Sequence, residues 1–313
     1  MKRGSWIAAA AAAPLAAAAQ PLIHVVVATA PIDGGISALV GVRGGFYKNH
    51  GLDVDLQSFS SGSAQVAALV GGSLNVAASN LLGVITAHLR GVPLQIIAPG
   101  GMYNSDQPAE MLVVRDDPAI RTAADLNGRT LASSALGDLD SIAALAWIDT
   151  HGGDSKTIHR VELPPSATTA ALIAGRIDAA GLQEPRLSEA LRTGKIRGLG
   201  KMYDAIGRRF LVSGAVAMAD WVNANRDAAV RFYRAQLEAN AYGNAHHDVT
   251  ARWLADFAKA DLDAILHTPR KVLAETLDLG MMQLVIDAAV KYKAIDRGFD
   301  ARELVAPVIL SAS

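Results

Sequence analysis

The sequence predicts an α/β protein made of two similar lobes, each built on a doubly wound sheet. Residues 69–78 and 172–181 share one pattern: an apolar helix end, a glycine, a short apolar strand and small residues. A glycine just past the last helical turn supplies the left-handed residue that ends a helix. A short apolar run predicts a strand covered on both faces. The repeated unit predicts two similar lobes, and 313 residues suffice for two lobes of ordinary size. We expect a ligand cleft between them.

The first lobe is predicted from alternating strands and helices. Residues 22–30 are apolar and β-branched, which predicts a buried strand, and residues 52–56 alternate as a half-buried strand does. Residues 74–78, 81–91 and 94–98 then predict a strand, a helix and a strand with short connections. This alternation is typical of a doubly wound sheet.

The second lobe is predicted from a change of pattern after residue 110. Its expected elements are a crossing strand at 111–114, a short capped helix at 122–128, a strand at 129–132 and a helix at 142–149. Residues 211–218 return the chain to the first lobe. We therefore assign residues 22–112 and 216–313 to lobe 1 and residues 113–215 to lobe 2. The two crossovers, near 111–115 and 211–217, would form a two-strand hinge.

The N-terminus predicts export. Lys2 and Arg3 precede an apolar, alanine-rich run over residues 6–19, and Ala17, Ala18 and Ala19 form a small-x-small cleavage site. This pattern is typical of a signal peptide, which we assign to residues 1–19 with cleavage near Ala19. The run is too short and too rich in alanine for a membrane anchor.

Composition excludes several classes of function. The chain has 29 basic and 30 acidic side chains, so its charge gives no reason to expect a nucleic-acid partner. Cysteine is absent, which excludes disulfides, thiolate metal sites and cysteine nucleophiles. The sequence contains no G-x-S-x-G, P-loop, H-E-x-x-H or complete G-x-G-x-x-G motif. We therefore expect no catalytic residues, metal site or cofactor, and interpret His246-His247-Asp248 as a solvated loop.

Polar residues follow the repeated strands in both lobes. Ser79 and Asn80 follow the first, and Gln183 and Glu184 follow the second. Ligands of open α/β sheets bind beyond the carboxyl ends of strands, so these residues are candidate contacts. Ordinary turn propensity explains each of them equally well.

An ordered series of short motifs carries a family resemblance. The motifs lie at residues 44–54, 71–77, 122–130, 163–165, 174–179 and 184–185. In this order and spacing the chain resembles periplasmic substrate-binding proteins of ABC importers in the nitrate, sulfonate and taurine class, including NMT1/THI5-like proteins. The resemblance implies a type II periplasmic-binding fold, a periplasmic location, a small-molecule ligand and a permease partner in the inner membrane. We expect a monomer.

Carried over by position, the family's ligand contacts fall on loops from both lobes. These candidates are Ile32, Asp33, Ser61, Gly62, Ser63, Ser79, Asn80, Ser134, Ala135, Leu136, Gln183 and Glu184. Several precede helices, whose free N–H groups can hold an anion. Helix capping is an alternative role for the serines. Tyr103 could line the pocket by stacking, or serve as an ordinary core or surface tyrosine.

Three carboxylates in these loops modify the expected ligand. Asp33, Asp138 and Glu184 have only Arg186 as a well-placed cation, which favours a zwitterion such as an amino-sulfonate over a simple inorganic anion. An amine-bearing heterocycle, such as a thiamine-precursor pyrimidine, is an alternative ligand. A dehydratase-like enzyme of the same fold, acting through Asn80 or Asp33, is an alternative function.

Overall fold

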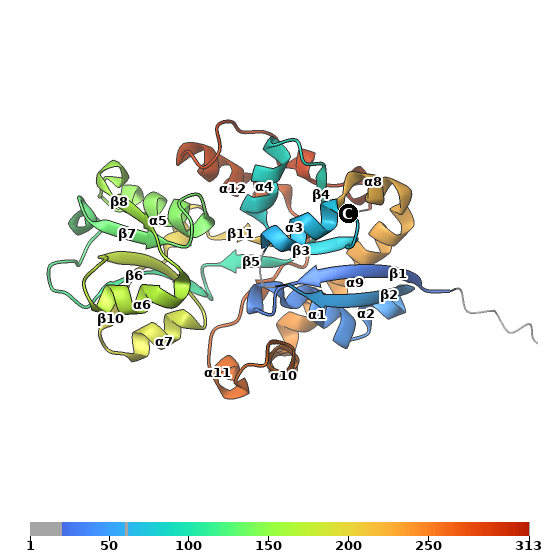
Figure 1. The fold of residues 1–313 in the computed structure, drawn as a ribbon, viewed down its shortest axis with the longest axis horizontal. Helices are drawn as coiled ribbons and strands as arrows, with labels where there is room; N and C mark the ends of the chain where they lie inside the picture. The colour runs from blue at the N-terminus through green and yellow to red at the C-terminus, as the bar shows by residue number, and fades with distance from the viewer. Residues whose placement is uncertain (1–20, 60–61, 313) are drawn as a thin grey trace, which may run out of the picture.

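The two-lobed α/β prediction is confirmed. A computed structural model describes residues 21–59 and 62–312, and Figure 1 shows two lobes side by side, each with helices around one sheet. The sheet of lobe 1 has the order β2 (Leu52–Ser58), β1 (Ile23–Thr29), β3 (Val76–Asn80), β12 (Ser213–Met218), β4 (Leu94–Pro99). The sheet of lobe 2 has the order β10 (Ile196–Gly200), β6 (Glu110–Arg115), β9 (Ala179–Gln183), β7 (Thr130–Ser133), β8 (His159–Glu162).

The two sheets are built in the same way. In each, three strands run parallel, β2, β1 and β3 in lobe 1 and β8, β7 and β9 in lobe 2. A strand that arrives from the other lobe, β12 or β6, is inserted antiparallel beside them. Most buried residues of these strands are apolar, as strands covered on both faces require, and the buried polar exceptions are Thr29 in β1, Glu110 in β6 and Ser133 in β7.

Helices surround both sheets. Those of lobe 2 are α5 (Leu139–Thr150), α6 (Pro165–Ile173) and α7 (Arg186–Arg192). Those of lobe 1 include α1 (Ile36–Arg43), α2 (Phe46–Asn49), α3 (Gly62–Val70), α4 (Leu81–Leu89), α8 (Ala219–Ala224), α9 (Arg226–Ala245), α10 (His247–Ala258), α11 (Leu262–Leu266), α12 (Leu279–Lys291) and α13 (Pro307–Leu310). The helix expected at 122–128 is a single 3₁₀ turn, Ala124–Leu126.

The repeated unit occurs in both lobes. Gly72 and Gly175 adopt φ angles of 74° and 67°, which is the left-handed conformation that favours glycine after a helix. The strands that follow begin at Val76 and Ala179. The predicted strand at 74–78 is therefore displaced toward the C-terminus, and Ser79 and Asn80 belong to β3 itself rather than to a loop after it.

A matched side chain explains where these strands begin. Asn75 Oδ1 accepts a hydrogen bond from the Val26 N–H at 2.8 Å, and Asp178 Oδ2 accepts one from the Thr130 N–H at 2.9 Å. In each lobe a side-chain oxygen thus accepts the N–H of the adjacent strand, where a backbone carbonyl would otherwise do so. Asn75 and Asp178 also donate their own N–H groups to the carbonyls of Val26 and Thr130, both at 2.9 Å. The strands β3 and β9 begin at the next residue, a detail that the apolar pattern does not contain.

The hinge differs in position from the expected crossovers. Between the lobes, β5 (Gly101–Asn104) pairs antiparallel with β11 (Arg209–Leu211), and β13 (Val272–Leu273) extends this small sheet (Figure 1). The segments expected at 111–115 and 211–217 lie mainly in β6 and β12, which are strands of the two lobe sheets. Their apolar side chains are buried within the lobes, and the short strands β5 and β11 next to them in the chain lie between the lobes. The proposed boundaries at 112/113 and 215/216 fall inside β6 and β12.

Candidate functional site

A cavity of about 570 Å³ lies between the lobes and is called the cleft below. Lobe 1 contributes the loop after β1 and residues of α10 and α11. Lobe 2 contributes the start of β6, the ends of β7 and β9, and the first residues of α6 and α7. The segment Thr268–Lys271, which leads from α11 to β13, also lines the cleft and is called the strap. The cleft therefore has walls from both lobes, as the sequence predicts.

The structure brings part of the predicted contact set together. The predicted contacts that line the cleft are Ile32, Asp33, Ser134, Gln183 and Glu184. The residues that line it without having been predicted as contacts include Glu110, Asp140, Arg270 and Lys271. The predicted contacts that are not among its lining residues are Ser79, Asn80, Tyr103, Ala135 and Leu136. Ser61 lies outside the described residues, and Gly62 and Ser63 are the first residues of α3.

The loop after β1 is shaped by a glycine. A Cβ at Gly35 would lie 2.6 Å from the Thr29 hydroxyl oxygen and in collision with the Ala30 carbonyl. Thr29 instead donates a hydrogen bond to the Gly35 carbonyl at 2.7 Å. This tight turn places Ile32 and Asp33 on the cleft wall.

Asp33 is bonded to the strap. Its Oδ1 accepts a hydrogen bond from Arg270 Nε and its Oδ2 accepts one from the Lys271 N–H, both at 2.5 Å. The Asp33 and Arg270 side chains are only 20% and 10% exposed, so water screens their attraction weakly. The expectation that Arg186 is the only cation near these carboxylates is therefore wrong, because the strap adds two.

Lys271 connects the strap to the other lobe. Its ammonium group forms an ion pair with Glu110 Oε1 at the start of β6. The two side chains are 8% and 1% exposed. The remaining oxygen, Glu110 Oε2, is buried and has no hydrogen-bond partner. A buried ion pair thus joins the lobes at one wall of the cleft, with an unused acceptor beside it.

Asp140 is a carboxylate of the cleft that forms no ion pair among the described residues. It accepts hydrogen bonds from Tyr203 OH at 2.6 Å and from Gln183 Nε2 at 3.0 and 3.1 Å. Burial, assisted by the charges of Asp138 and Glu110, raises the pKa of Asp140 to about 6. Asp140 is therefore the group in the cleft best placed to accept a ligand's positive charge.

Two of the predicted acidic residues also act as helix caps. Asp138 Oδ1 accepts the Ser141 N–H of α5 at 2.7 Å, and its Oδ2 accepts the Ser134 hydroxyl. Both Glu184 oxygens are bonded to Ser188 of α7, at 3.1 Å to its N–H and 2.8 Å to its hydroxyl. The structure thus shows a capping role for these carboxylates. Ser134 does not cap a helix itself, but its hydroxyl donates a hydrogen bond to Asp138, which caps α5.

The predicted contacts outside the cleft have structural roles. Asn80 Oδ1 accepts the Gly83 N–H at 2.6 Å and caps α4. Tyr103 is 1% exposed, packs against Tyr203 and Phe210 at the hinge, and donates a hydrogen bond to Asp204. Burial raises the Tyr103 pKa. Tyr103 is therefore a core residue, which was one of the alternatives that the sequence left open.

The charges of the cleft favour a ligand with a positive group. Its lining includes five carboxyl side chains and three cationic ones, and two of those cations are paired with Asp33 and Glu110. Arg270 Nη1 is buried without a hydrogen-bond partner, as is Glu110 Oε2. Among the buried atoms of the cleft, a cationic donor and an anionic acceptor are therefore both unused, which suits a ligand with groups of both signs.

Within residues 21–59 and 62–312 no group of three or more His, Asp or Glu side chains is arranged to hold a metal ion. Across the same ranges no helix has the length and apolarity needed to span a bilayer. His246 and His247 lie at the junction of α9 and α10.

A family model described as NMT1/THI5 like matches residues 36–248, which is more than half of the chain. The chain belongs to the NMT1/THI5-like family. Among curated relatives, a protein of Brucella abortus is 25% identical over 228 residues, covering 72% of this chain and 68% of its own length. Its provisional name is that of a binding protein. This membership confirms the family that the ordered motifs indicated.

Solved structures show that this member of the NMT1/THI5-like family has a widely used fold. The periplasmic aliphatic sulphonate-binding protein of Escherichia coli has a TM-score of 0.74 at 20% identity, with 92% of this chain and 98% of that one covered. A ligand-binding component of an ABC-type import system from Staphylococcus aureus has a TM-score of 0.75 at 13% identity, with 94% of this chain and 99% of that one covered. A desulfurization enzyme has a TM-score of 0.68 at 15% identity, with 93% of this chain and 98% of that one covered. At these identities the likeness establishes the fold.

Proposed function

We propose that this protein is the solute-binding component of an ABC importer. It would capture a small sulfonate-type anion or zwitterion, of which taurine is the model, and deliver it to a permease in the inner membrane. Its site of action would be the periplasm, after removal of residues 1–19, and it would act as a monomer. Family membership and the two-lobed fold support the binding role.

One observation carries the choice of a zwitterion. The cleft has an unused cationic donor, Arg270 Nη1, and an unused anionic acceptor, Glu110 Oε2, together with Asp140, which has no cation partner. A sulfonate would satisfy the arginine, and an ammonium group would satisfy the carboxylates. Charged hydrogen bonds of this kind are each worth about 1.5–3 kcal/mol.

Lobe closure would provide the signal to the permease. Ligand contacts made from both lobes favour the closed state, because only that state makes them all. Rotation would occur about β5 and β11, the strands that join the lobes. Of the proposed contacts, Ile32, Asp33, Ser134, Gln183 and Glu184 line the cleft.

Calorimetric titration with three matched ligands tests the proposal. Taurine carries an ammonium and a sulfonate, isethionate replaces the ammonium by a hydroxyl, and ethanolamine replaces the sulfonate by a hydroxyl. Taurine should bind roughly 10- to 100-fold more tightly than either analogue, the equivalent of about 1.4–2.7 kcal/mol for each lost charge. Equal affinity for isethionate would contradict the role of the carboxylates.

The Asp140→Asn variant sharpens this experiment. It keeps the size of the side chain and an acceptor for Tyr203, but removes a negative charge of the cleft that no cation neutralises. The preference for taurine over isethionate should shrink, whereas the preference over ethanolamine should remain. Ligand recovered unchanged after incubation would distinguish binding from the enzymatic alternative, which turnover would support.

The cavity also supports a second candidate ligand. Its volume of about 570 Å³ exceeds what taurine needs, and Leu163, Leu182, Leu254 and Ile265 supply apolar walls. An amine-bearing heterocycle, such as an aminopyrimidine, would use both the room and the carboxylates. Tighter binding of an aminopyrimidine than of taurine in the same titration would favour it.

A further inference from the structure

A second cavity lies on the other side of the strap. Its volume is about 690 Å³, which is within the usual range for small-molecule sites. Its walls come from α1, from the end of α9 and the start of α10, and from the loop between β5 and β6. We call it the rear cavity. It shares with the cleft only the four strap residues, Thr268–Lys271.

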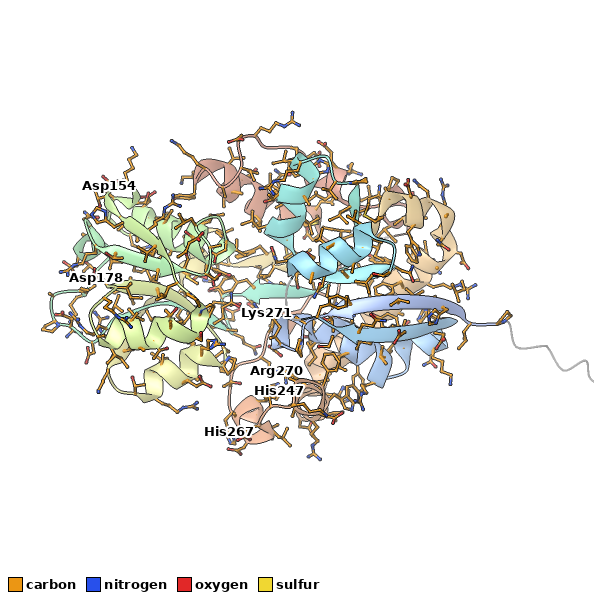
Figure 2. The ribbon with its side chains drawn as sticks, viewed as in Figure 1. Asp154, Asp178, His247, His267, Arg270 and Lys271 are labelled. Atoms are coloured by element: carbon orange, nitrogen blue, oxygen red, sulfur yellow. The ribbon has the colours of Figure 1, made fainter. Side chains whose placement is uncertain are left out.

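The rear cavity has one polar side, formed by the strap and α10. Figure 2 shows Arg270 and His247 near each other below Lys271, and both line the cavity. The Arg270 side chain is nine-tenths buried, its Nε is bonded to Asp33, and its Nη1 has no partner. The other charged groups of this wall are already paired, Lys271 with Glu110 and Asp106 with Arg208. Among the charged groups of the lining, the unused hydrogen-bonding capacity is therefore that of a cationic donor.

The histidine adds to this polarity without adding a fixed charge. Burial and the nearby charge of Arg270 lower the pKa of His247. A neutral imidazole leaves Arg270 as the main cationic group available to a ligand. An anionic group arriving here would therefore meet a buried donor and an adjacent ring that can take up a proton.

The opposite side of the cavity is apolar. Ile36 and Val40 of α1 face this space together with Val272 and Leu273 of β13. Three of these side chains are at most 3% exposed. An apolar surface next to a single buried donor is the lining expected for a ligand with an apolar body and one anionic end.

We propose that the rear cavity is a second ligand site, which binds a small organic acid with its carboxylate at Arg270 and its apolar body against α1 and β13. The orphaned guanidinium nitrogen and the apolar wall carry this assignment together. It shares Arg270 with the anion contact proposed for the cleft, so the two ligands would compete for that nitrogen, whereas the other walls of the two cavities are separate.

Calorimetric titration with benzoate tests the proposal, with benzyl alcohol as the matched neutral probe. Two variants fill the rear cavity from different walls: Gln107→Trp from the β5–β6 loop and His247→Trp from α10. Ile32→Trp fills the cleft instead. Each variant is first shown to be folded by circular dichroism and thermal unfolding. Titrating to about 10 mM detects dissociation constants near 1 mM, the equivalent of about −4.1 kcal/mol.

Benzoate should bind to the wild type and to Ile32→Trp, and should lose at least tenfold in affinity in both rear-cavity variants. Benzyl alcohol should bind at least tenfold more weakly than benzoate. No benzoate binding to the wild type, or loss of binding only in Ile32→Trp, would overturn the proposal, as would equal affinity for the alcohol. Taurine titrations on the same proteins separate this result from the proposed function, because taurine binding should survive Gln107→Trp.

Discussion

Replacing Lys271 by methionine should remove a large part of the stability of the protein. The methionine keeps the apolar stem and deletes the ammonium group that neutralises Glu110. Glu110 is 1% exposed, and its other oxygen already lacks a partner. Removing one member of a buried ion pair typically costs about 3–5 kcal/mol, because the remaining charge is left without compensation.

Urea unfolding at pH 7 measures this loss as a shift in the transition midpoint. A thermal melt should show a decrease on the order of 10 °C, since about 1 kcal/mol corresponds to about 2–4 °C in chains of this size class. The double variant Lys271→Met/Glu110→Gln should recover most of the loss, because an amide carries no charge. That recovery assigns the effect to the charge of Glu110 rather than to the altered packing.

The exposed pair Arg208 and Asp106 is the matched control. Its side chains are 71% and 76% exposed, so Arg208→Met should change the free energy of unfolding by no more than about 1 kcal/mol. The reasoning is refuted if Lys271→Met is as stable as the wild type. It is also refuted if the double variant is no more stable than the single one.

Three further changes follow from other contacts. The pKa of Asp140 is raised to about 6 in the folded protein, so its ionisation opposes folding. The free energy of unfolding of the wild type, relative to that of Asp140→Asn, should therefore fall by about 2 kcal/mol as pH rises from about 4 to about 7. A difference between the two proteins that stays constant over this pH range would contradict the prediction. Asn75→Ala and Asp178→Ala should each lose about 1–3 kcal/mol in denaturant unfolding, because each leaves a strand N–H without its acceptor, while Ser311→Ala serves as an exposed control. Gly35→Ala should weaken ligand binding in the cleft by displacing the loop that carries Asp33, and unchanged affinity in a titration would show that this turn tolerates the Cβ.

The fold was largely predictable because its signals are local. The repeated glycines and the apolar runs placed the strands and helices of both lobes in the right order, and the ordered motifs indicated the right family. The start of β3 was misplaced because Asn75 replaces a backbone acceptor, a bond made to a residue far away in the chain.

The candidate site was predictable only in part. Positions where a strand ends, such as Gln183 at the end of β9 and Asp33 in the loop after β1, are recognisable in an α/β pattern. The strap has no such signal, because Arg270 and Lys271 follow a short helix near the end of lobe 1 and resemble ordinary surface cations in the sequence. Glu110 could have been noticed only as an acidic residue directly before an apolar run, which by itself does not indicate a site.

The sequence by itself determined the two-lobed α/β architecture, the family and the acidic character of the cleft. These depend on the periodicity of apolar residues, on glycines after helices and on residue types, all of which are written along the chain. Tertiary structure alone decided which charges meet: it brought Lys271 to Glu110 and Arg270 to Asp33 over more than a hundred residues of sequence separation. Electrostatic interactions depend on distance and burial in space, so neither the pairing of these groups nor the acceptor and donor left free among them could be obtained from their order in the chain.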